Sequence, residues 1–125
     1  MIEIICGEKG KGKTKELLGR VNSSIATVSG SVVYLDKSQK HMYELNNKVR
    51  LIDVSQFLIE NSSEFIGFVC GVLSQDHDLQ QMYFDSFLKI ACLEGKDITP
   101  VIEKLDMISK NFEVDFVLSV SMDAE

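Results

Sequence analysis

Short apolar runs alternate along this chain with longer segments in which apolar residues recur every three or four positions. The runs occupy residues 2–6, 32–35, 49–53, 79–85 and 116–121. Runs of this length, closed by polar or turn residues, are typical of strands buried on both faces of a parallel sheet. Strands that alternate with helices form right-handed βαβ units. The pattern therefore predicts one domain over residues 1–125, with a three-layer α/β/α fold and a five-stranded, mainly parallel sheet.

The first two helices are predicted from an apolar face and from a capping signal. After the first run, one helical face carries Leu17, Leu18, Val21 and Ile25. Asn61 and Glu64 have capping-box spacing ahead of an apolar stripe over residues 65–73. The same stripe is rich enough in aromatic and β-branched residues for a strand. Gly67 and Gly71, four residues apart, favour a helix that packs closely on the sheet.

The second half of the chain predicts a further long helix and a short one. Thr99 followed by Pro100 indicates a capped helix start. We expect its buried face to carry Val101, Ile102, Leu105, Ile108 and Phe112. Residues 87–94 are predicted as a short helix ended by Gly95, and residues 38–45 are weakly helical.

Composition is that of an ordinary globular domain. The chain has 125 residues, of which 45% are hydrophobic and 26% charged, enough for one core. No apolar run approaches the roughly 20 residues of a membrane span, and no signal-peptide pattern is visible, so we expect a cytoplasmic protein. Cys6, Cys70 and Cys92 are expected to be buried, reduced thiols. His41 and His77 lack the spacing of metal ligands and are interpreted as structural or solvent-facing.

The chemistry is concentrated in residues 7–14, which read Gly-Glu-Lys-Gly-Lys-Gly-Lys-Thr, a complete G-x-x-x-x-G-K-[ST] sequence between a strand and a helix. Glycines let the backbone wrap a polyphosphate, so that N–H groups and the positive end of the helix face the anion. Lys13 is expected to reach the β- and γ-phosphates, and the Thr14 hydroxyl to bind Mg²⁺. ATP is the expected nucleotide, since no guanine-reading run is present. The predicted binding residues are Gly7, Glu8, Lys9, Gly10, Lys11, Gly12, Lys13, Thr14 and Lys15; a lysine-rich surface turn is the alternative.

The distribution of charge favours a nucleotide over a nucleic acid. The net charge is −6, with a pI near 4.9, whereas a domain that grips nucleic acid is usually basic. Four lysines nevertheless fall within residues 9–15, and such a cluster repels itself unless a polyanion neutralises it. We therefore expect a bound triphosphate and no direct binding of nucleic acid.

With this loop in this context, the chain resembles the P-loop NTPase superfamily over essentially its whole length, although only the loop is a specific match. It also looks like a set of small, poorly characterised bacterial P-loop proteins, some of which are labelled after the pilus-retraction (twitching motility) ATPase. A retraction motor is several times longer, so its function is not carried over. Partitioning ATPases have a lysine directly after the first glycine, where this chain has Glu8, with Lys9 one position later. The resemblance implies a minimal P-loop NTPase fold.

A P-loop site also needs a carboxylate at the end of a neighbouring strand, which supports the water shell of Mg²⁺. Residues 82–85, Met-Tyr-Phe-Asp, resemble this Walker B pattern, so Asp85 is predicted as a catalytic and metal-binding residue beside Thr14. The alternative is a helix over residues 78–94 with Asp85 in solvent. The other candidates for the carboxylate are Asp53, Asp76 and Asp78.

Polar residues end two further strands. Asp36 is interpreted first as the cap of the next helix, and alternatively as a group that orients a water or binds a substrate. Ser119 and Ser121 lie near the tip of the last strand, where related ATPases keep a polar sensor of the γ-phosphate. Turn roles are the alternative for both serines.

Several features predict slow hydrolysis. Ser86 follows Asp85 where many P-loop ATPases have a water-polarising Glu, and the only arginines are Arg20 and Arg50. Loss of such groups costs several orders of magnitude in rate. The leading hypothesis is a Mg²⁺-dependent ATP-binding protein with weak hydrolysis, stimulated by self-association or by a protein partner. The alternatives are a non-hydrolysing, nucleotide-sensing interaction module and a small-molecule kinase.

Overall fold

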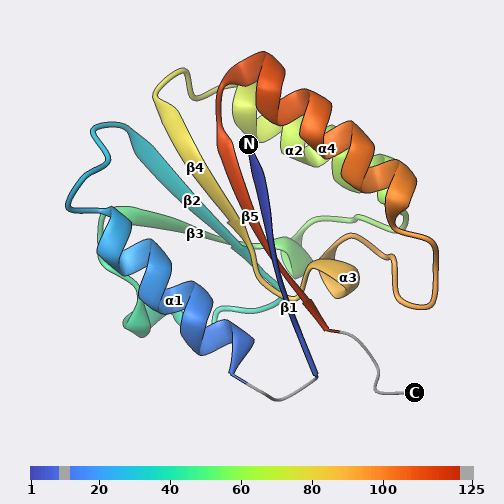
Figure 1. Ribbon diagram of the computed structural model, residues 1–125, viewed down its shortest axis with the longest axis horizontal. Coiled ribbons are helices and arrows are strands. Elements are labelled where there is room, and N and C mark those ends of the chain that lie inside the picture. The colour runs from blue at the N-terminus through green and yellow to red at the C-terminus, as the bar shows by residue number, and fades with distance from the viewer. Residues whose placement is uncertain (9–11, 122–125) are drawn as a thin grey trace.

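The computed structural model describes residues 1–8 and 12–121, which form one twisted sheet covered on both faces by helices (Figure 1). The strands are β1 (Ile2–Gly7), β2 (Ser31–Asp36), β3 (Val49–Asp53), β4 (Leu79–Phe84) and β5 (Asp115–Ser121). Their order across the sheet is β1-β5-β4-β2-β3, and every neighbouring pair is parallel. The predicted five-stranded sheet is confirmed, and it is entirely parallel.

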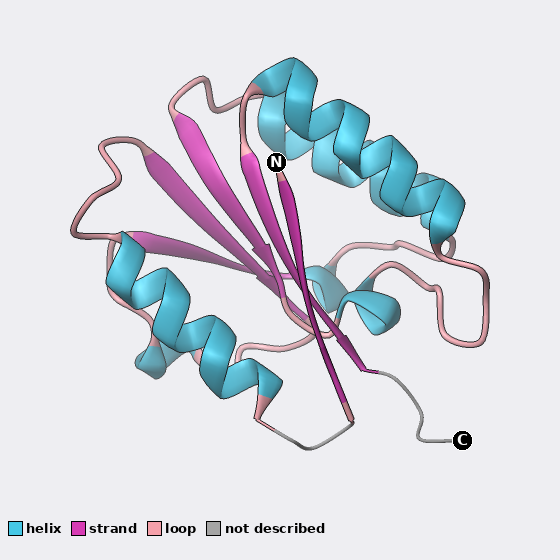
Figure 2. Ribbon diagram, viewed as in Figure 1, coloured by secondary structure: helices cyan, strands magenta, loops and turns pink. Residues whose placement is uncertain are grey.

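The helices are α1 (Lys13–Ser24), α2 (Ser62–Ser74), α3 (Phe87–Ile90) and α4 (Thr99–Phe112), with 3-10 turns η1 (Met42–Glu44) and η2 (Val54–Gln56). Helix α1 covers one face, while α2 and α4 lie side by side on the other (Figures 1 and 2). Alternate residues of β2 divide between the two cores: Val32 and Tyr34 pack with α1, and Val33 and Leu35 pack beneath α2 and α4. This is the expected three-layer α/β/α fold.

A parallel sheet brings the carboxyl ends of its strands to one edge, and connecting loops there are the usual place for a ligand. In this chain that edge gathers Gly7 at the end of β1, Asp36 at the end of β2 and Ser121 at the end of β5. Asp85 follows β4 directly. Residues from four different parts of the sequence therefore meet at one edge of the sheet.

The predicted helix α2 is confirmed, but the prediction that Gly67 and Gly71 let it pack closely on the sheet is wrong. The Asn61 carboxamide caps it by accepting a hydrogen bond from the Glu64 N–H at 2.9 Å. Phe65 and Val69 are fully buried against the sheet, whereas Gly67 and Gly71 are exposed with open space around them. Helical periodicity places the two glycines opposite the buried stripe, so they make no close approach to the sheet.

Several boundaries and exposures also differ from expectation. Thr99 is the first residue of α4 rather than its cap, and Phe112 at its end is 52% exposed. Helix α3 is shorter than the predicted 87–94, because Cys92 adopts a left-handed backbone with φ of 60°. Residues 38–45 contain only the single turn η1.

Contrary to the prediction, the three cysteines are not fully buried. Cys6 is exposed and Cys70 and Cys92 are partly exposed. Cys6 lies on β1, an edge strand with a neighbour on one side only, so an apolar run there does not guarantee burial on both faces.

In the described part of the chain, no helix combines the length and apolar character needed to cross a membrane.

The contrasting surroundings of two glycines predict opposite effects of adding one methyl group. Gly67→Ala is expected to raise the free energy of unfolding by about 0.5–1 kcal/mol, because the site is an exposed helix interior with open space. Gly30→Ala is expected to lower it by about 1–3 kcal/mol, because the new Cβ would lie 2.0 Å from the Asp78 carbonyl oxygen. Urea denaturation of both variants measures the difference. Equal effects would contradict the placement of α2 and of the turn before β2.

Candidate functional site

The predicted phosphate loop joins the end of β1 to the start of α1. Gly12 adopts a left-handed backbone with φ of +84°, a conformation that favours glycine. Helix α1 begins at Lys13, whose ammonium group donates a hydrogen bond of 2.6 Å to the Glu8 carbonyl oxygen. Glu8 is exposed. Predicted site residues Lys9, Gly10 and Lys11 lie outside the described residues.

Asp85 stands at the end of a strand, as predicted, and not on a helix over residues 78–94. Its backbone N–H donates a hydrogen bond of 2.9 Å to the Leu35 carbonyl, which continues the pairing of β4 with β2 by one residue. The residue is 2% exposed. The sheet itself therefore fixes this carboxylate at the edge where β1 meets the loop.

Three hydroxyl groups from three parts of the chain donate to the Asp85 carboxylate. Oδ1 accepts from the Thr14 hydroxyl at 3.1 Å and from the Ser119 hydroxyl at 3.2 Å. Oδ2 accepts from the Tyr34 hydroxyl at 2.7 Å. A buried carboxylate needs such partners, since desolvation without hydrogen bonds is very costly. The arrangement ties the first turn of α1 to the ends of β2, β4 and β5.

The turn after Asp85 is strained and tied to the same network. Ser86 is a non-glycine residue with φ of 54°, in the left-handed region. Its N–H donates to the Ser119 Oγ at 2.9 Å. Strain of this kind persists only where neighbouring contacts fix the backbone, and it is concentrated at functional sites. Here it turns the chain sharply from β4 into α3.

A pocket with a volume of about 370 Å³ opens beside this network. It lies between Gly12–Thr14, the residue after β2, and the segment from Asp85 to Gly95, with Ser119 and Ser121 at its wall. Three lysines line it, Lys13, Lys37 and Lys89, against the carboxylates of Asp85 and Glu94. The predicted binding residue Lys15 is exposed on α1 and is not part of the lining. The lysines and the hydroxyl groups of the lining therefore suit a compact anion.

The competing carboxylates lie elsewhere. Asp53 accepts hydrogen bonds from the backbone N–H and the hydroxyl of Ser55 and so caps η2. Asp76 contacts Arg50 and Ser31 in the turn before β4, at the opposite edge of the sheet, and Asp78 lies in the same turn. Among the four candidate carboxylates, all of them described, Asp85 is the one that contacts Thr14.

Asp36 does not cap a helix, which corrects the first interpretation of this residue. It is 2% exposed, and its Oδ1 accepts a hydrogen bond of 2.7 Å from the Lys37 N–H. The next helical turn begins at Met42, beyond its reach as a cap. Its Oδ2 is buried and has no hydrogen-bond partner among residues 1–8 and 12–121. Burial, with a smaller contribution from the nearby Asp85 carboxylate, raises the pKa of Asp36 to about 6.

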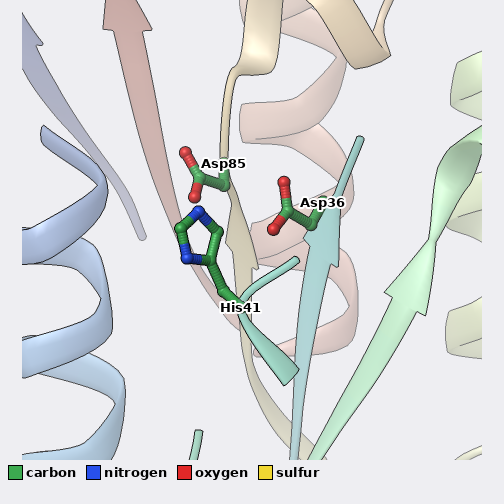
Figure 3. A group of neighbouring side chains, drawn as sticks. All are labelled: Asp36, His41 and Asp85. Atoms are coloured by element: carbon green, nitrogen blue, oxygen red, sulfur yellow. The ribbon is translucent and has the colours of Figure 1, made fainter. Parts of the chain in front are cut away.

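His41 joins these two carboxylates, although nothing in its sequence surroundings indicated a site. One ligand atom from each of Asp36, His41 and Asp85 lies within 4.8 Å of the other two (Figure 3). Tyr34, Lys37 and Lys89 were also missed as site residues. A tyrosine inside the apolar run 32–35 was the one available signal, because a buried hydroxyl needs a partner.

Comparison with models of protein families gives no match, and no curated protein sequence is significantly similar to this chain. Inference about its function therefore depends on the residues and their geometry.

The raised pKa of Asp36 predicts how stability depends on pH. Between about pH 4 and pH 6 the folded state binds this proton more tightly than the unfolded state, so Asp36 destabilises the fold increasingly as pH rises through this window. Asp36→Asn removes the titration and keeps the acceptor for the Lys37 N–H. The stability of the variant relative to the wild type should therefore grow by about 3 kcal/mol between pH 4 and pH 7 and level off above.

Denaturation of both proteins in EDTA across that range measures this difference without interference from metal ions. A difference that stays constant with pH would show that Asp36 titrates normally.

Proposed function

We propose that this chain is a Mg²⁺-dependent ATP-binding protein that hydrolyses ATP slowly. One observation carries the proposal: the Thr14 hydroxyl, in the first turn of a helix that follows a glycine-rich loop, donates to the buried Asp85 carboxylate at 3.1 Å. The sequence motif required a threonine and a strand-end carboxylate in just this relation. The two residues are 71 positions apart, so their meeting depends on the fold and does not follow from the loop sequence alone.

The pocket has the chemistry that a triphosphate requires. Lys13, Lys37 and Lys89 supply positive charge from three elements. Helix α1, with 12 residues, presents its N-terminal end and its positive dipole to the same space. These features support binding of the phosphates and say nothing of the base; adenine follows only from the lack of a guanine-reading sequence.

The oxygen donors at the pocket fit Mg²⁺. Thr14 offers a hydroxyl and Asp85 a carboxylate, and Mg²⁺ prefers such hard oxygen ligands together with water and phosphate. When bound, the ion would neutralise charge on the phosphate oxygens. Ser119 and Tyr34 then act through Asp85, since their hydroxyl groups hold its two oxygens in place.

Slow turnover is expected because the described lining of the pocket contains no arginine, and because no glutamate follows Asp85 directly. Ser86 occupies the position after Asp85, and its N–H is bound to Ser119. Neither arginine lines the pocket: Arg20 pairs with Glu3 and Arg50 with Asp76. A water-orienting residue or an arginine from a partner can each change the rate by orders of magnitude. A partner or a second copy that brings an arginine would raise the rate.

A nucleotide-sensing interaction module is the second candidate, and the connection between β2 and β3 favours it. That connection begins with Lys37 in the pocket and continues to Met42 and Tyr43, which are 45% and 91% exposed. Phe57 and Leu58, also exposed, follow β3 at the edge of the sheet. A ligand held by Lys37 would thus contact the same segment that presents apolar side chains to a partner. Size-exclusion chromatography of the apo, ADP and ATP forms tests this, and identical elution would count against it.

Removal of the loop lysine tests the phosphate site. Lys13→Ala should weaken ATP binding by at least about tenfold, because a charge-assisted contact to phosphate contributes roughly 1.5–3 kcal/mol. Lys104→Ala is the matched control, since Lys104 is exposed on α4 on the other face of the sheet. Calorimetric titration with ATP and ADP measures both variants. Equal affinities for the wild type and Lys13→Ala would refute the site, and stoichiometric binding without any turnover would refute the hydrolysis.

The contact between Thr14 and Asp85 is tested by a pair of substitutions at Thr14. Thr14→Val keeps the shape and removes the hydroxyl, whereas Thr14→Ser keeps the hydroxyl. The valine variant should bind ATP no more tightly with Mg²⁺ than with EDTA, and the serine variant should retain most of the gain from Mg²⁺. Titrations of both variants with and without Mg²⁺ provide the comparison. A valine variant with an undiminished response to Mg²⁺ would show that Thr14 takes no part in binding the ion.

A further inference from the structure

We propose that Asp36, His41 and Asp85 form a second cation site, which binds one divalent first-row transition metal ion of the Mn²⁺ or Zn²⁺ type. This site goes beyond the proposed function, because it needs no nucleotide and uses residues outside the phosphate loop. It shares one residue, Asp85, with the nucleotide pocket.

The three side chains come from neighbouring parts of the sheet edge. Asp36 ends β2, Asp85 follows the adjacent strand β4, and His41 lies on the connection that leaves β2 (Figure 3). Their ligand atoms lie within 4.8 Å of one another. Three ligand atoms that surround an ion at 2.0–2.2 Å lie about 3.0–3.6 Å from one another, so an inward movement of about 1 Å closes the site.

The hydrogen bonding of Asp36 points to a missing ligand. Its Oδ2 is buried without a partner in the described part of the chain, on a residue that is 2% exposed. An unsatisfied buried carboxylate oxygen is costly, and the nearby Asp85 carboxylate adds like-charge repulsion. A bound cation would supply the partner for Asp36 and compensate the charge of both groups. The side chain of His41 is 20% exposed and leaves a route from solvent.

The orientation of His41 suits a metal ligand. Its Nδ1 lies 3.1 Å from a carboxylate oxygen of Glu44. Donation of the Nδ1 proton to Glu44 leaves the lone pair on Nε2, the nitrogen that points toward Asp85 (Figure 3). A histidine held by a carboxylate on its far nitrogen is the usual arrangement around protein-bound metal ions. Glu44 is therefore a positioning residue for His41.

The donor set decides the class of ion. One imidazole nitrogen with two carboxylate groups suits Mn²⁺, Zn²⁺ and similar ions, whereas Mg²⁺ favours oxygen ligands alone. Two cations of different preference can thus be bound on either side of Asp85.

Binding of Mn²⁺ to the nucleotide-free protein tests the inference. Mn²⁺ is the cleaner probe because Cys6 is exposed and thiolates bind Zn²⁺ tightly. Electron paramagnetic resonance of free Mn²⁺ should show one ion bound per chain. His41→Ala should weaken its binding by about tenfold or more, and Glu44→Gln by about tenfold. His77→Ala is the matched control, since His77 is exposed in the turn before β4, at the opposite edge of the sheet.

Asp36→Asn serves as the second ligand variant, because it is expected to fold at least as stably as the wild type without metal. It should lose Mn²⁺ binding while keeping its far-UV circular dichroism. Lys13→Ala should bind Mn²⁺ like the wild type, which separates this site from the nucleotide site. The proposal is overturned if the wild type binds no Mn²⁺, or if its binding survives both His41→Ala and Asp36→Asn. Loss of binding in Thr14→Val alone would place the ion at the nucleotide pocket and would equally overturn it.

Discussion

A carboxylate that leaves water must find hydrogen-bond donors, and the buried Asp85 takes its donors from three separate parts of the chain. The hydroxyl groups of Thr14, Ser119 and Tyr34 all donate to it. These contacts join the first turn of α1 to the strands β2 and β5 across the end of β4. If this carboxylate were displaced, the Thr14 and Tyr34 hydroxyl groups would lose this acceptor, and the pocket would lose part of its lining.

The strand order makes this convergence possible. Because β5 lies between β1 and β4, the loop after β1 and the residue after β4 are separated by the width of one strand. Ser119 on β5 fills that gap: it donates to Asp85 and accepts from the Ser86 N–H. Tyr34 approaches from β2 on the other side. Asp53, at the end of β3, lies two strands away from β4 and three strands away from β5. It therefore meets other partners.

Local patterns in the sequence predicted most of the fold. All five strands and the helices α1, α2 and α4 follow from apolar periodicity and capping residues, because these depend on neighbours a few positions away. Predictions of which residues are buried failed where burial depends on the rest of the molecule. Cys6 lies on an edge strand, and Gly67 and Gly71 face away from the sheet. The loop and Asp85 could be proposed from motifs. Tyr34, His41, Lys37 and Lys89 could not, because their meeting depends on strand order and on the path of two connections, which no short sequence pattern encodes.

Departures from good local structure gather around Asp85. Ser86 holds a left-handed backbone, Asp36 buries an oxygen without a partner, and two carboxylates are buried near one another. Each costs free energy, and none is needed to build an α/β/α sandwich, since the buried residues described elsewhere are apolar apart from Ser109. The other left-handed non-glycine residues in the described part of the chain, Cys92 and Glu113, lie at the ends of helices, where this conformation is common. Strain and unpartnered burial that coincide at one edge of the sheet indicate that this edge serves something other than folding. The buried carboxylates and the unpartnered oxygen of Asp36 therefore favour a cation at this edge independently of the glycine-rich loop.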